Sequence, residues 1–498
     1  MHLTFLNPQG NFDPQDSNWT EHPDFGGQLV YVKQLALAIA SLGHKVDILT
    51  RQIIDPEWPE FAGKLDGYPD APGVRILRLP AGLPEFLRKE DLWPYIIRDW
   101  VPNILGFYQQ EATFPDALTS HYADGGLSAV LIQEHTGIPF TFTAHSLGAQ
   151  KMDKMGVTRQ NLAEIDKRLH FSRRILAERL SMNHSAVNIT STRQERFEQY
   201  HHPAYQGAVQ VADDQRFEVI PPGVDLSIFS TVANFPQEAS LQARIEGYLS
   251  QDLPPERQSL PAILASSRLD PKKNHLGLIQ AYASSPSLQE AANLILITGA
   301  LEDPLHHPEG TSPAERQLID QIRQQVESAN LWGKVSAFGL QGQPALAAAY
   351  RYLVKRRSVF ALTSLYEPFG LAPLEAMACG LPVVVTQNGG PSESLQDSSQ
   401  EFGVLVDPSN PVSIARGLER LILNPETWRS FSERGRQRVI DHYTWERTAA
   451  GYLSAIQRLL AKSEVPPSRD LLPIPSYFLD PKPEKDIPLT ELERLYWG

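Results

Sequence analysis

Two glutamates flank a short turn in the second half of the chain. Glu367 and Glu375 are eight residues apart, and Gly370 and Pro373 lie between them. The apolar run SVFALT at 358–363 comes just before this pair and is typical of a buried parallel strand. Two carboxylates at a strand end could act as general acid and general base. Which chemistry they support depends on the elements that hold them.

The segment after the first glutamate predicts a short helix. Pro373 suits its first position, because proline lacks an N–H that would have no partner there, and Gly380 suits the residue after its end. Ala372 is then near the N-cap, and Glu375 is near the third helical position. The free N–H groups of Leu371 and Ala372 would favour an anion. Glu375 could instead close half of a capping box, and the spacing leaves both roles open.

A basic loop follows another apolar run. The run at 262–267 leads into RLDPKKN at 268–274. Arg268 and Lys273 could contact the same phosphate groups, one as a planar fork and the other as a point charge. A solvated basic turn is the alternative.

Two N-terminal loops are further candidates. Gly26 and Gly27 precede Gln28 at the start of an apolar-periodic helix, and their lack of side chains would let the backbone approach a ligand. A simple tight turn is the alternative. His145 ends the apolar run that starts at residue 138 and should lie at the carboxyl end of a strand. It could donate to a sugar hydroxyl, or be a core or capping histidine.

Four dispersed cations form the last candidate group, namely Lys89, Lys151, Arg173 and Arg174. A helix over 171–180 places the two arginines side by side, so we expect at most one of them to face any one pocket. A solvated helix face is the alternative for the whole group.

The order of apolar runs and helical patterns predicts an α/β fold with two doubly wound, Rossmann-like domains. Residues 1–225 form the first domain, 226–445 the second, and 446–498 a helix and Pro-rich tail that pack back on the body. The polar stretch at 226–257 is expected to be irregular. A cleft between the two sheets, at the carboxyl ends of their strands, is the expected ligand site. The expected strands are 3–6, 45–50, 74–79, 116–121, 138–145, 187–192, 217–223, 262–267, 293–298, 334–339, 358–363, 382–386 and 403–406.

Several classes of function are excluded or disfavoured by the composition. The net charge of -13 argues against an extended nucleic-acid surface. A single cysteine, no signal peptide and no run of 18 apolar residues favour a cytoplasmic protein. The chain has no Asp-x-Asp pair, no P-loop, no GxSxG elbow and no zinc-ligand spacing.

These motifs resemble a known family. EPFGLAPLEAMACGLPVVVTQNGGPSE resembles the donor-site signature of retaining glycosyltransferase family 4, and SSRLDPKKN resembles its partner loop. The segment from FLNPQGNFDPQDSNW to KVDILTR is similar to the sucrose-phosphate synthases within that family. TSHYADGGL, FTFTAHSLGAQK, RRILAERL, STRQERFEQY and VIPPGVD are similar to them too. The resemblance runs from about residue 3 to about residue 460.

The resemblance implies a GT-B fold that binds the acceptor in its first domain and the donor in its second. It implies retaining transfer of glucose from UDP-glucose to fructose 6-phosphate, giving sucrose 6-phosphate and UDP, with no metal and no other cofactor. The favoured family mechanism is front-face attack, in which the departing phosphate oxygen takes the acceptor's proton. A separate sucrose-phosphate phosphatase is an expected downstream partner. The sequence does not decide whether the nucleotide of the donor is UDP, ADP or GDP.

The resemblance also assigns roles to residues. Arg268 and Lys273 would hold the diphosphate, Glu375 the ribose hydroxyls, and Glu367 the donor glucose. His145 would contact the region of the glucose 6-hydroxyl. Gly26 and Gly27 would close over the phosphate, next to the backbone of Leu371 and Ala372. The acceptor would be bound by Gln28, Lys89, Tyr122, Ser146, Lys151, Arg173 and Arg174, with the choice between the two arginines open.

Related activities remain as alternatives. A sucrose synthase would use unphosphorylated fructose as its acceptor. The paired arginines favour a phosphorylated acceptor and so argue against a sucrose synthase. A mannosylfructose-phosphate synthase would use a mannosyl donor. A nucleotide-sugar epimerase of the same fold would need no acceptor, and a nucleotide-sugar-binding regulator would have no activity.

Overall fold

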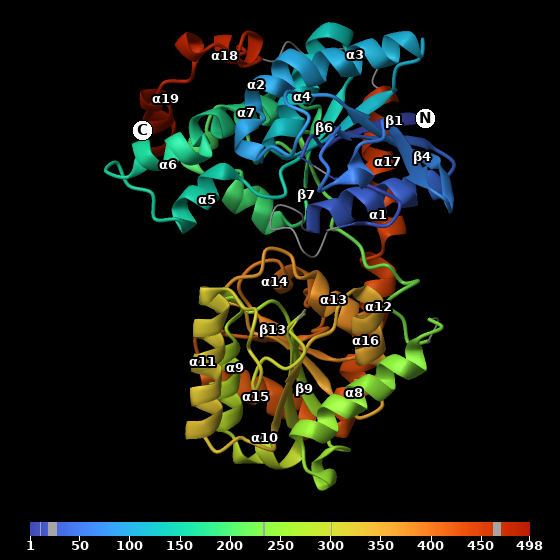
Figure 1. Ribbon diagram of the computed structural model, residues 1–498, viewed down its shortest axis with the longest axis vertical. Coiled ribbons are helices and arrows are strands. Elements are labelled where there is room, and N and C mark those ends of the chain that lie inside the picture. Colours follow the sequence, from blue (N-terminus) through green and yellow to red (C-terminus); the bar gives the residue numbers. More distant parts are fainter. Residues whose placement is uncertain (10, 18–26, 233–234, 300, 462–469) are drawn as a thin grey trace. The chain divides into compact units, whose positions relative to one another are not determined.

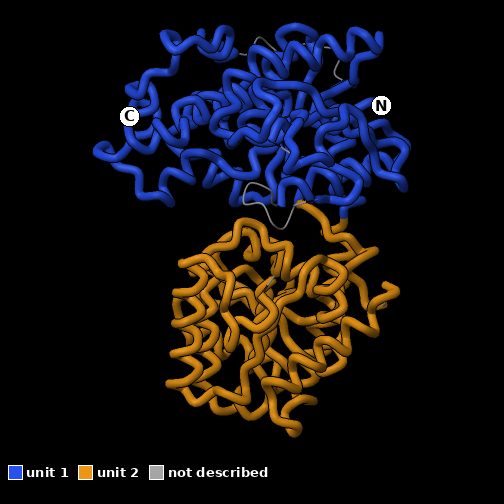
Figure 2. Tube along the Cα trace, in the orientation of Figure 1, with its two compact units in different colours: residues 1–221, 445–498 blue, residues 222–444 orange. Residues whose placement is uncertain are grey.

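The computed structural model describes residues 1–9, 11–17, 27–232, 235–299, 301–461 and 470–498 (Figure 1). The chain divides into two compact units, coloured separately in Figure 2. Unit 1 contains Met1–Pro221 and Trp445–Gly498, and unit 2 contains Pro222–Thr444.

Unit 1 is built on a sheet of eight strands among its described residues, in the order β3-β4-β2-β1-β5-β6-β7-β8. Every neighbouring pair is parallel except β3 and β4, which form an antiparallel edge. The strands are β1 (His2–Leu6), β2 (Lys45–Arg51), β3 (Leu65–Tyr68), β4 (Ala71–Leu79), β5 (Ala117–His121), β6 (Phe140–Thr143), β7 (Val187–Thr190) and β8 (Phe217–Val219).

Helices cover both faces of this sheet, as a parallel sheet requires. They are α1 (Gly27–Ser41), α2 (Trp93–Tyr95), α3 (Val101–Gln110), α4 (Tyr122–Thr136), α5 (Gly148–Lys154), α6 (Leu162–Leu169), α7 (Phe171–His184), α17 (Trp445–Ala461), α18 (Ser476–Leu479) and α19 (Leu489–Trp497). The last three come from the end of the chain: α17 packs on α1, and α19 packs on α7 (Figure 1).

Unit 2 has a wholly parallel sheet of six strands among its described residues, in the order β11-β10-β9-β12-β13-β14. The strands are β9 (Ala262–Ser266), β10 (Asn293–Ile297), β11 (Val335–Phe338), β12 (Val359–Leu362), β13 (Val383–Thr386) and β14 (Val404–Val406). The helices are α8 (Glu238–Asp252), α9 (His275–Ala283), α10 (Pro286–Ala291), α11 (Pro313–Ser328), α12 (Gln343–Val354), α13 (Leu371–Ala378), α14 (Pro391–Ser394), α15 (Pro411–Ile422) and α16 (Pro425–His442).

Local signals explain where many of these elements begin. α11, α15 and α16 each have proline at the first helical position, directly after a Ser or Asn whose side chain accepts backbone N–H groups. Alternate strand residues pack into different cores on the two faces of each sheet. In β9, for example, Ile263 belongs to one core cluster and Leu264 to the other. The predicted α/β architecture with two Rossmann-like domains is therefore confirmed.

The structure corrects one expectation about an irregular segment. The stretch at 226–257 contains helix α8, whose Ile245 and Leu249 are buried. Its apolar residues recur every four positions, but too sparsely to stand out from the polar ones. The described part of the Pro-rich tail forms α18 and α19. Among the described residues, no helix combines the length and apolar character needed to cross a membrane.

Candidate active site

The candidate donor residues of unit 2 follow two adjacent strands. β9 and β12 pair in parallel, so the loops after them start at the same edge of the sheet. Lys273 follows β9 and Glu367 follows β12, and their side chains form an ion pair with 2.9 Å between Nζ and Oε2. The loops are also joined by the backbone, where the N–H of Leu365 donates to the carbonyl of Lys272 at 2.9 Å. Arg268 is exposed, and no hydrogen bond from it to a described residue is formed.

Helix α13 begins at Leu371, one residue after Gly370, which has a φ of 93° in the left-handed region. Pro373 is therefore the third helical residue and Glu375 the fifth, so the expected position of Glu375 near the third helical residue is wrong. The first four N–H groups of any helix lack partners, so proline is tolerated beyond the first position. The turn at Gly370 sets the start instead.

This helix start removes the capping alternative for Glu375. No side chain of a described residue caps the N-terminus of α13, and no acidic residue lies in its first turn. Leu371 and Ala372 are instead the first two residues of the helix, where backbone N–H groups are available to an anion. Glu375 is half-buried, and burial raises the pKa of its carboxyl group to about 7.

A second loop, which contains Asn388 and Gly390, forms backbone hydrogen bonds with Glu367, a role that the sequence did not reveal. The N–H of Glu367 donates to the carbonyl of Asn388, and its carbonyl accepts from the N–H of Gly390, both at 3.0 Å. A Cβ on Gly389 would lie 2.0 Å from that carbonyl oxygen, and Gly389 has a φ of 103°. The glycine pair in QNGGPSE was the available signal, because it permits this close approach.

Asn274 is another residue whose role the sequence did not reveal. Its backbone is left-handed, with a φ of 57°. Its side-chain amide donates to the carbonyls of Thr363 and Pro408 at 3.0 and 2.8 Å. The amide oxygen accepts from the N–H of Gly277 at the start of α9. Asn274 therefore ties the basic loop to the strand end that leads to Glu367.

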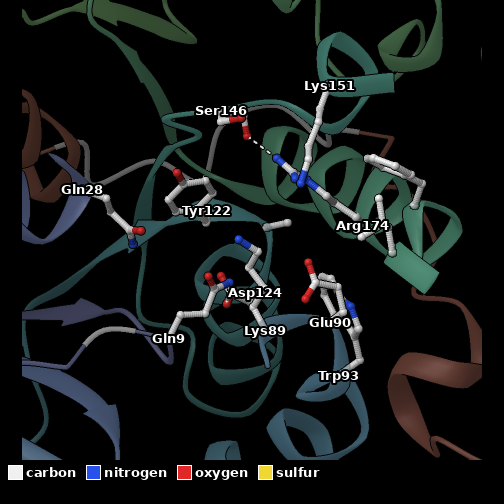
Figure 3. Close-up of a pocket in the computed structure, with 13 residues that line it drawn as sticks. Gln9, Gln28, Lys89, Glu90, Trp93, Tyr122, Asp124, Ser146, Lys151 and Arg174 are labelled. Carbon is white, nitrogen blue, oxygen red and sulfur yellow. Dashed lines mark hydrogen bonds between the residues drawn. The ribbon is translucent and has the colours of Figure 1, made fainter. Parts of the chain in front are cut away.

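Unit 1 contains a pocket of about 200 Å³ at the carboxyl ends of its strands (Figure 3). Six of the seven residues predicted to bind the acceptor line it: Gln28, Lys89, Tyr122, Ser146, Lys151 and Arg174. The other lining residues are Gln9, Glu90, Trp93, Ala123, Asp124, Leu169 and Phe171. In Figure 3 the side chains of Lys89, Lys151 and Arg174 converge on this pocket from separate elements.

Arg174 is held in a defined orientation on α7. Its Nε donates to Glu178 at 2.9 Å, and one terminal nitrogen donates to the carbonyl of Ser146 at 2.7 Å (Figure 3). Burial lowers the pKa of the guanidinium, but the Glu178 carboxylate more than offsets this, and the net shift is upward. A permanent positive charge therefore lies in the wall of the pocket.

Arg173, the seventh predicted residue, does not line the pocket. Its guanidinium forms two hydrogen bonds with Asp486 of the C-terminal tail, at 2.9 and 2.5 Å. It also lies over the ring of Tyr477, 4.6 Å from the centroid. The two neighbouring arginines of α7 thus have different partners, and Arg174 is the one at the pocket.

Asp124 is a buried carboxylate that lines the pocket, a position that the sequence did not reveal. It lies in the first turn of α4 and is 3% exposed. Burial raises the pKa of its carboxyl group to about 6, although hydrogen bonds from the Gln9 amide and from the N–H of Gly125 oppose the shift. The pocket therefore offers hydrogen-bond acceptors as well as cations.

His145 lies two residues after β6, in a left-handed conformation with a φ of 55°. Its Nε2 is 2.8 Å from Nδ1 of His121, and its ring packs edge-on against Tyr31. Burial lowers the pKa of His145 to about 3, so the imidazole is neutral near pH 7. Tyr122 also has a positive φ, 61°, and both residues follow strand ends, where such strain accompanies ligand sites.

The glycine pair falls partly outside the described residues. Gly26 is not among them. Gly27 is the first residue of α1 and is exposed, and Gln28 follows it at the edge of the pocket. No cluster of three or more His, Cys, Asp or Glu residues suited to a metal ion occurs in the part of the chain that the structure describes.

Comparisons with known proteins agree with this arrangement. A family model described as "Sucrose synthase first GT-B domain" matches residues 2–249, and one described as "Glycosyl transferases group 1" matches residues 253–438. A probable sucrose-phosphate synthase from Thermosipho melanesiensis is 42% identical, over 92% of this chain and 97% of that protein. The sucrose-phosphate synthase of Spinacia oleracea is 31% identical, and the match covers 92% of this chain but 47% of that longer protein.

A solved structure has the same fold. The sucrose-phosphate synthase from Thermosynechococcus elongatus superposes with a TM-score of 0.66 and 25% sequence identity, covering 93% of this chain and all of that one. The GT-B fold is thereby established for this chain. Its identity to the Thermosipho protein over nearly the full length of both chains places it among enzymes of sucrose synthesis. The chain belongs to the sucrose-phosphate synthase family of glycosyltransferases.

Proposed function

We propose that the enzyme transfers glucose from UDP-glucose to fructose 6-phosphate with retention of configuration, giving sucrose 6-phosphate and UDP without a metal ion. The observation that carries the proposal is the pocket of unit 1. Its wall combines Lys89, Lys151 and Arg174 with hydroxyl and amide groups, which is the chemistry that a sugar phosphate needs. A neutral sugar would not need three cations in so small a space.

The acceptor's two ends would meet different parts of this pocket. The phosphate group fits the cationic wall, where the fork of Arg174 can form two parallel hydrogen bonds. Gln28, Tyr122 and Asp124 also line the pocket and can hydrogen-bond sugar hydroxyls. A glutamine amide, a carboxylate and a tyrosine hydroxyl together supply both donors and acceptors.

The donor would bind to unit 2. Lys273, Arg268 and the N–H groups at the start of α13 would hold the diphosphate, and Glu375 the ribose hydroxyls. When the bond between the glucose C1 and the diphosphate breaks, negative charge develops on UDP. Fixed positive groups stabilise that charge without reorganisation, and such groups are often the largest contribution to catalysis. Glu367, paired with Lys273 at 2.9 Å, would contact the glucose.

The reaction can be balanced without a protein nucleophile. The fructose hydroxyl oxygen forms a bond to C1 on the face that UDP leaves. The hydroxyl proton passes to the departing phosphate oxygen, and the electron pair of the broken bond stays on UDP. The protein then contributes binding, orientation and electrostatic stabilisation. Neutral His145 can donate or accept a hydrogen bond at the sugar, but does not carry charge near pH 7. A separate phosphatase would remove the phosphate from the product.

An activity matrix tests the proposal. UDP-glucose, ADP-glucose, GDP-glucose and GDP-mannose are each assayed with fructose 6-phosphate, with fructose and with no acceptor, in the presence and absence of EDTA. We expect the highest kcat/KM for UDP-glucose with fructose 6-phosphate, unaffected by EDTA, and a product that keeps the α configuration at the glucose anomeric carbon.

Each other outcome would point to a different enzyme. Preference for unphosphorylated fructose would identify a sucrose synthase. Preference for GDP-mannose would identify a mannosylfructose-phosphate synthase. Conversion of the nucleotide sugar without acceptor would identify an epimerase, and loss of activity in EDTA would contradict metal independence.

A further inference from the structure

Glu178 is a buried carboxylate on α7. It contacts Arg174 on the same helix and the first residue of α5, the helix that carries Lys151. Glu178 has no solvent exposure. Its two oxygens accept from the N–H of Gly148, the first residue of α5, at 2.9 and 3.0 Å. One oxygen also accepts from Nε of Arg174 at 2.9 Å, and the other from the hydroxyl of Tyr205. Glu178 does not line the pocket itself.

The consequence for Arg174 is a fixed direction. Its Nε points at Glu178, and a terminal nitrogen points at the carbonyl of Ser146. These two contacts lie on one side of the planar guanidinium, which leaves N–H groups of the other side for a ligand. Without the carboxylate, the long side chain would have several rotamers available and would lose this preorganisation.

The consequence for Lys151 is indirect. It lies on α5, three residues after Gly148, whose N–H is held by both oxygens of Glu178. The hydroxyl of Tyr205 strengthens the attachment, because it accepts from the N–H of Ala149 at 3.0 Å while donating to Glu178. One carboxylate therefore fixes the start of the helix that carries Lys151 and the direction of Arg174.

We propose that Glu178 is a positioning residue that sets the preference of the enzyme for a phosphorylated acceptor, acting through Arg174 and α5 without touching the substrate. The proposal rests on the proposed function, in which this pocket holds the acceptor phosphate. The negative charge of Glu178 is paired with Arg174, and Arg174 lines the pocket whereas Glu178 does not, so the carboxylate does not face the phosphate directly.

The test is Glu178→Gln, which keeps the shape of the side chain but replaces an acceptor oxygen with a donor NH₂ facing N–H groups. We expect the KM for fructose 6-phosphate to rise about tenfold or more, while the KM for UDP-glucose changes less than about twofold. The ratio of kcat/KM for fructose 6-phosphate to that for fructose should fall by a similar factor. The exposed Glu134→Gln on α4 is the matched control and should change neither value.

A double variant separates positioning from a general structural role. If Glu178 acts through Arg174 and α5, then adding Glu178→Gln to Arg174→Ala should raise the KM for fructose 6-phosphate by a smaller factor than Glu178→Gln does in the wild type, because the part that acts through Arg174 is already lost. Additive effects, or equal rises in both KM values together with a lower melting temperature, would overturn the proposal. A wild-type preference for fructose 6-phosphate that Glu178→Gln retains would overturn it while leaving the proposed function intact. A wild type without that preference would refute both.

Gly148→Ala provides a test that leaves the carboxylate in place. A Cβ at this position would lie 3.1 Å from Nε of Arg174, from an oxygen of Glu178 and from Ile175. The methyl group of alanine must displace the Arg174–Glu178 ion pair slightly. We therefore expect the preference for fructose 6-phosphate to fall about threefold or more. Gly106→Ala on α3, where a Cβ would meet nothing within 4 Å, is the control. If Glu178→Gln fails to fold, Gly148→Ala decides the question, and an unchanged preference would contradict the proposal.

Discussion

At the scale of single residues, the two arginines of α7 show how adjacent positions on a helix take unrelated roles. Successive residues on a helix point about 100° apart, so neighbours seldom share a partner. Arg174 faces the pocket and pairs with Glu178, whereas Arg173 faces the tail and pairs with Asp486. The sequence showed that at most one of them would serve the pocket, and side-chain geometry selected Arg174.

The first prediction concerns this pair. Arg174→Ala should raise the KM for fructose 6-phosphate about 10- to 100-fold, because a bidentate charged contact to the phosphate is lost, and should change the KM for UDP-glucose little. Arg173→Ala should leave both KM values within about twofold. Steady-state kinetics with each substrate varied in turn measures both. A larger acceptor effect from Arg173→Ala would contradict the assignment.

The second prediction concerns Glu375, whose carboxyl group has its pKa raised to about 7 by burial. In the proposed complex, ribose hydroxyls donate to this carboxylate, which favours the charged form and lowers the pKa. UDP binding at pH 6 should therefore release most of one proton from Glu375, and affinity should rise as pH increases towards 7.

Calorimetry in two buffers with different ionisation enthalpies counts the protons released on UDP binding. UDP itself titrates near this pH, so Glu375→Gln is the reference: its proton release should be smaller than that of the wild type by the amount due to Glu375. Equal proton release by the two proteins would show that Glu375 does not change its charge when UDP binds.

At the scale of secondary-structure elements, the C-terminal tail is a structural part of unit 1. The N–H of Leu472 donates to Asn183 at 2.8 Å, and the hydroxyl of Tyr496 donates to Asp153. Phe478 on α18 is fully buried, with its ring centroid 6.3 Å from that of Trp93, which lines the pocket. The tail thus packs against Trp93, which also lines the pocket of unit 1.

The third prediction concerns this packing. Phe478→Ala should lower the free energy of unfolding by about 3–5 kcal/mol, because a large buried ring is replaced by a cavity. Its neighbour Leu479 is 62% exposed, so Leu479→Ala should change the stability by less than about 0.5 kcal/mol. Urea denaturation followed by fluorescence compares the two variants. Similar midpoints for both would show that the tail does not contribute to the core of unit 1.

At the scale of the whole molecule, each unit has its own sheet, its own cores and its own candidate ligand site. The pocket lined by Lys89, Lys151 and Arg174 lies within unit 1, and the Lys273–Glu367 pair and the start of α13 lie within unit 2. Ligand-dependent effects should therefore be separable by unit when each substrate is added alone.

The fourth prediction follows from this separation. Fructose 6-phosphate alone should slow hydrogen exchange of backbone amides around residues 146–151 and 171–178, which carry Lys151 and Arg174. UDP alone should protect residues 268–275 and 365–376 instead, because ligand binding suppresses local opening near its own site. Exchange measured by mass spectrometry on the full chain gives both maps. Protection of the acceptor segments by UDP alone would contradict the assignment of ligands to units.

Much of the fold was predictable from the sequence. Apolar runs bounded by Gly, Pro and polar residues marked most strands, and the helix expected to begin at residue 171 begins there in the structure, as α7. Parallel strands buried on both faces give strong signals of this kind. Helix α8 and the short edge strand β3 were missed, because their apolar residues are few and their stability comes from the elements they pack against.

The candidate site was predictable in its residue types but not in its geometry. The sequence alone determined which strand ends carry cations, carboxylates and glycines, because these residues follow recognisable apolar runs. Only the tertiary structure decided that Arg174 faces the pocket, that α13 starts at Leu371 after the turn at Gly370, and that Glu178 joins α7 to α5 across thirty residues of chain. The physical reason is that hydrogen bonds and ion pairs between distant segments depend on side-chain directions that are fixed only when the sheet and its helices pack together.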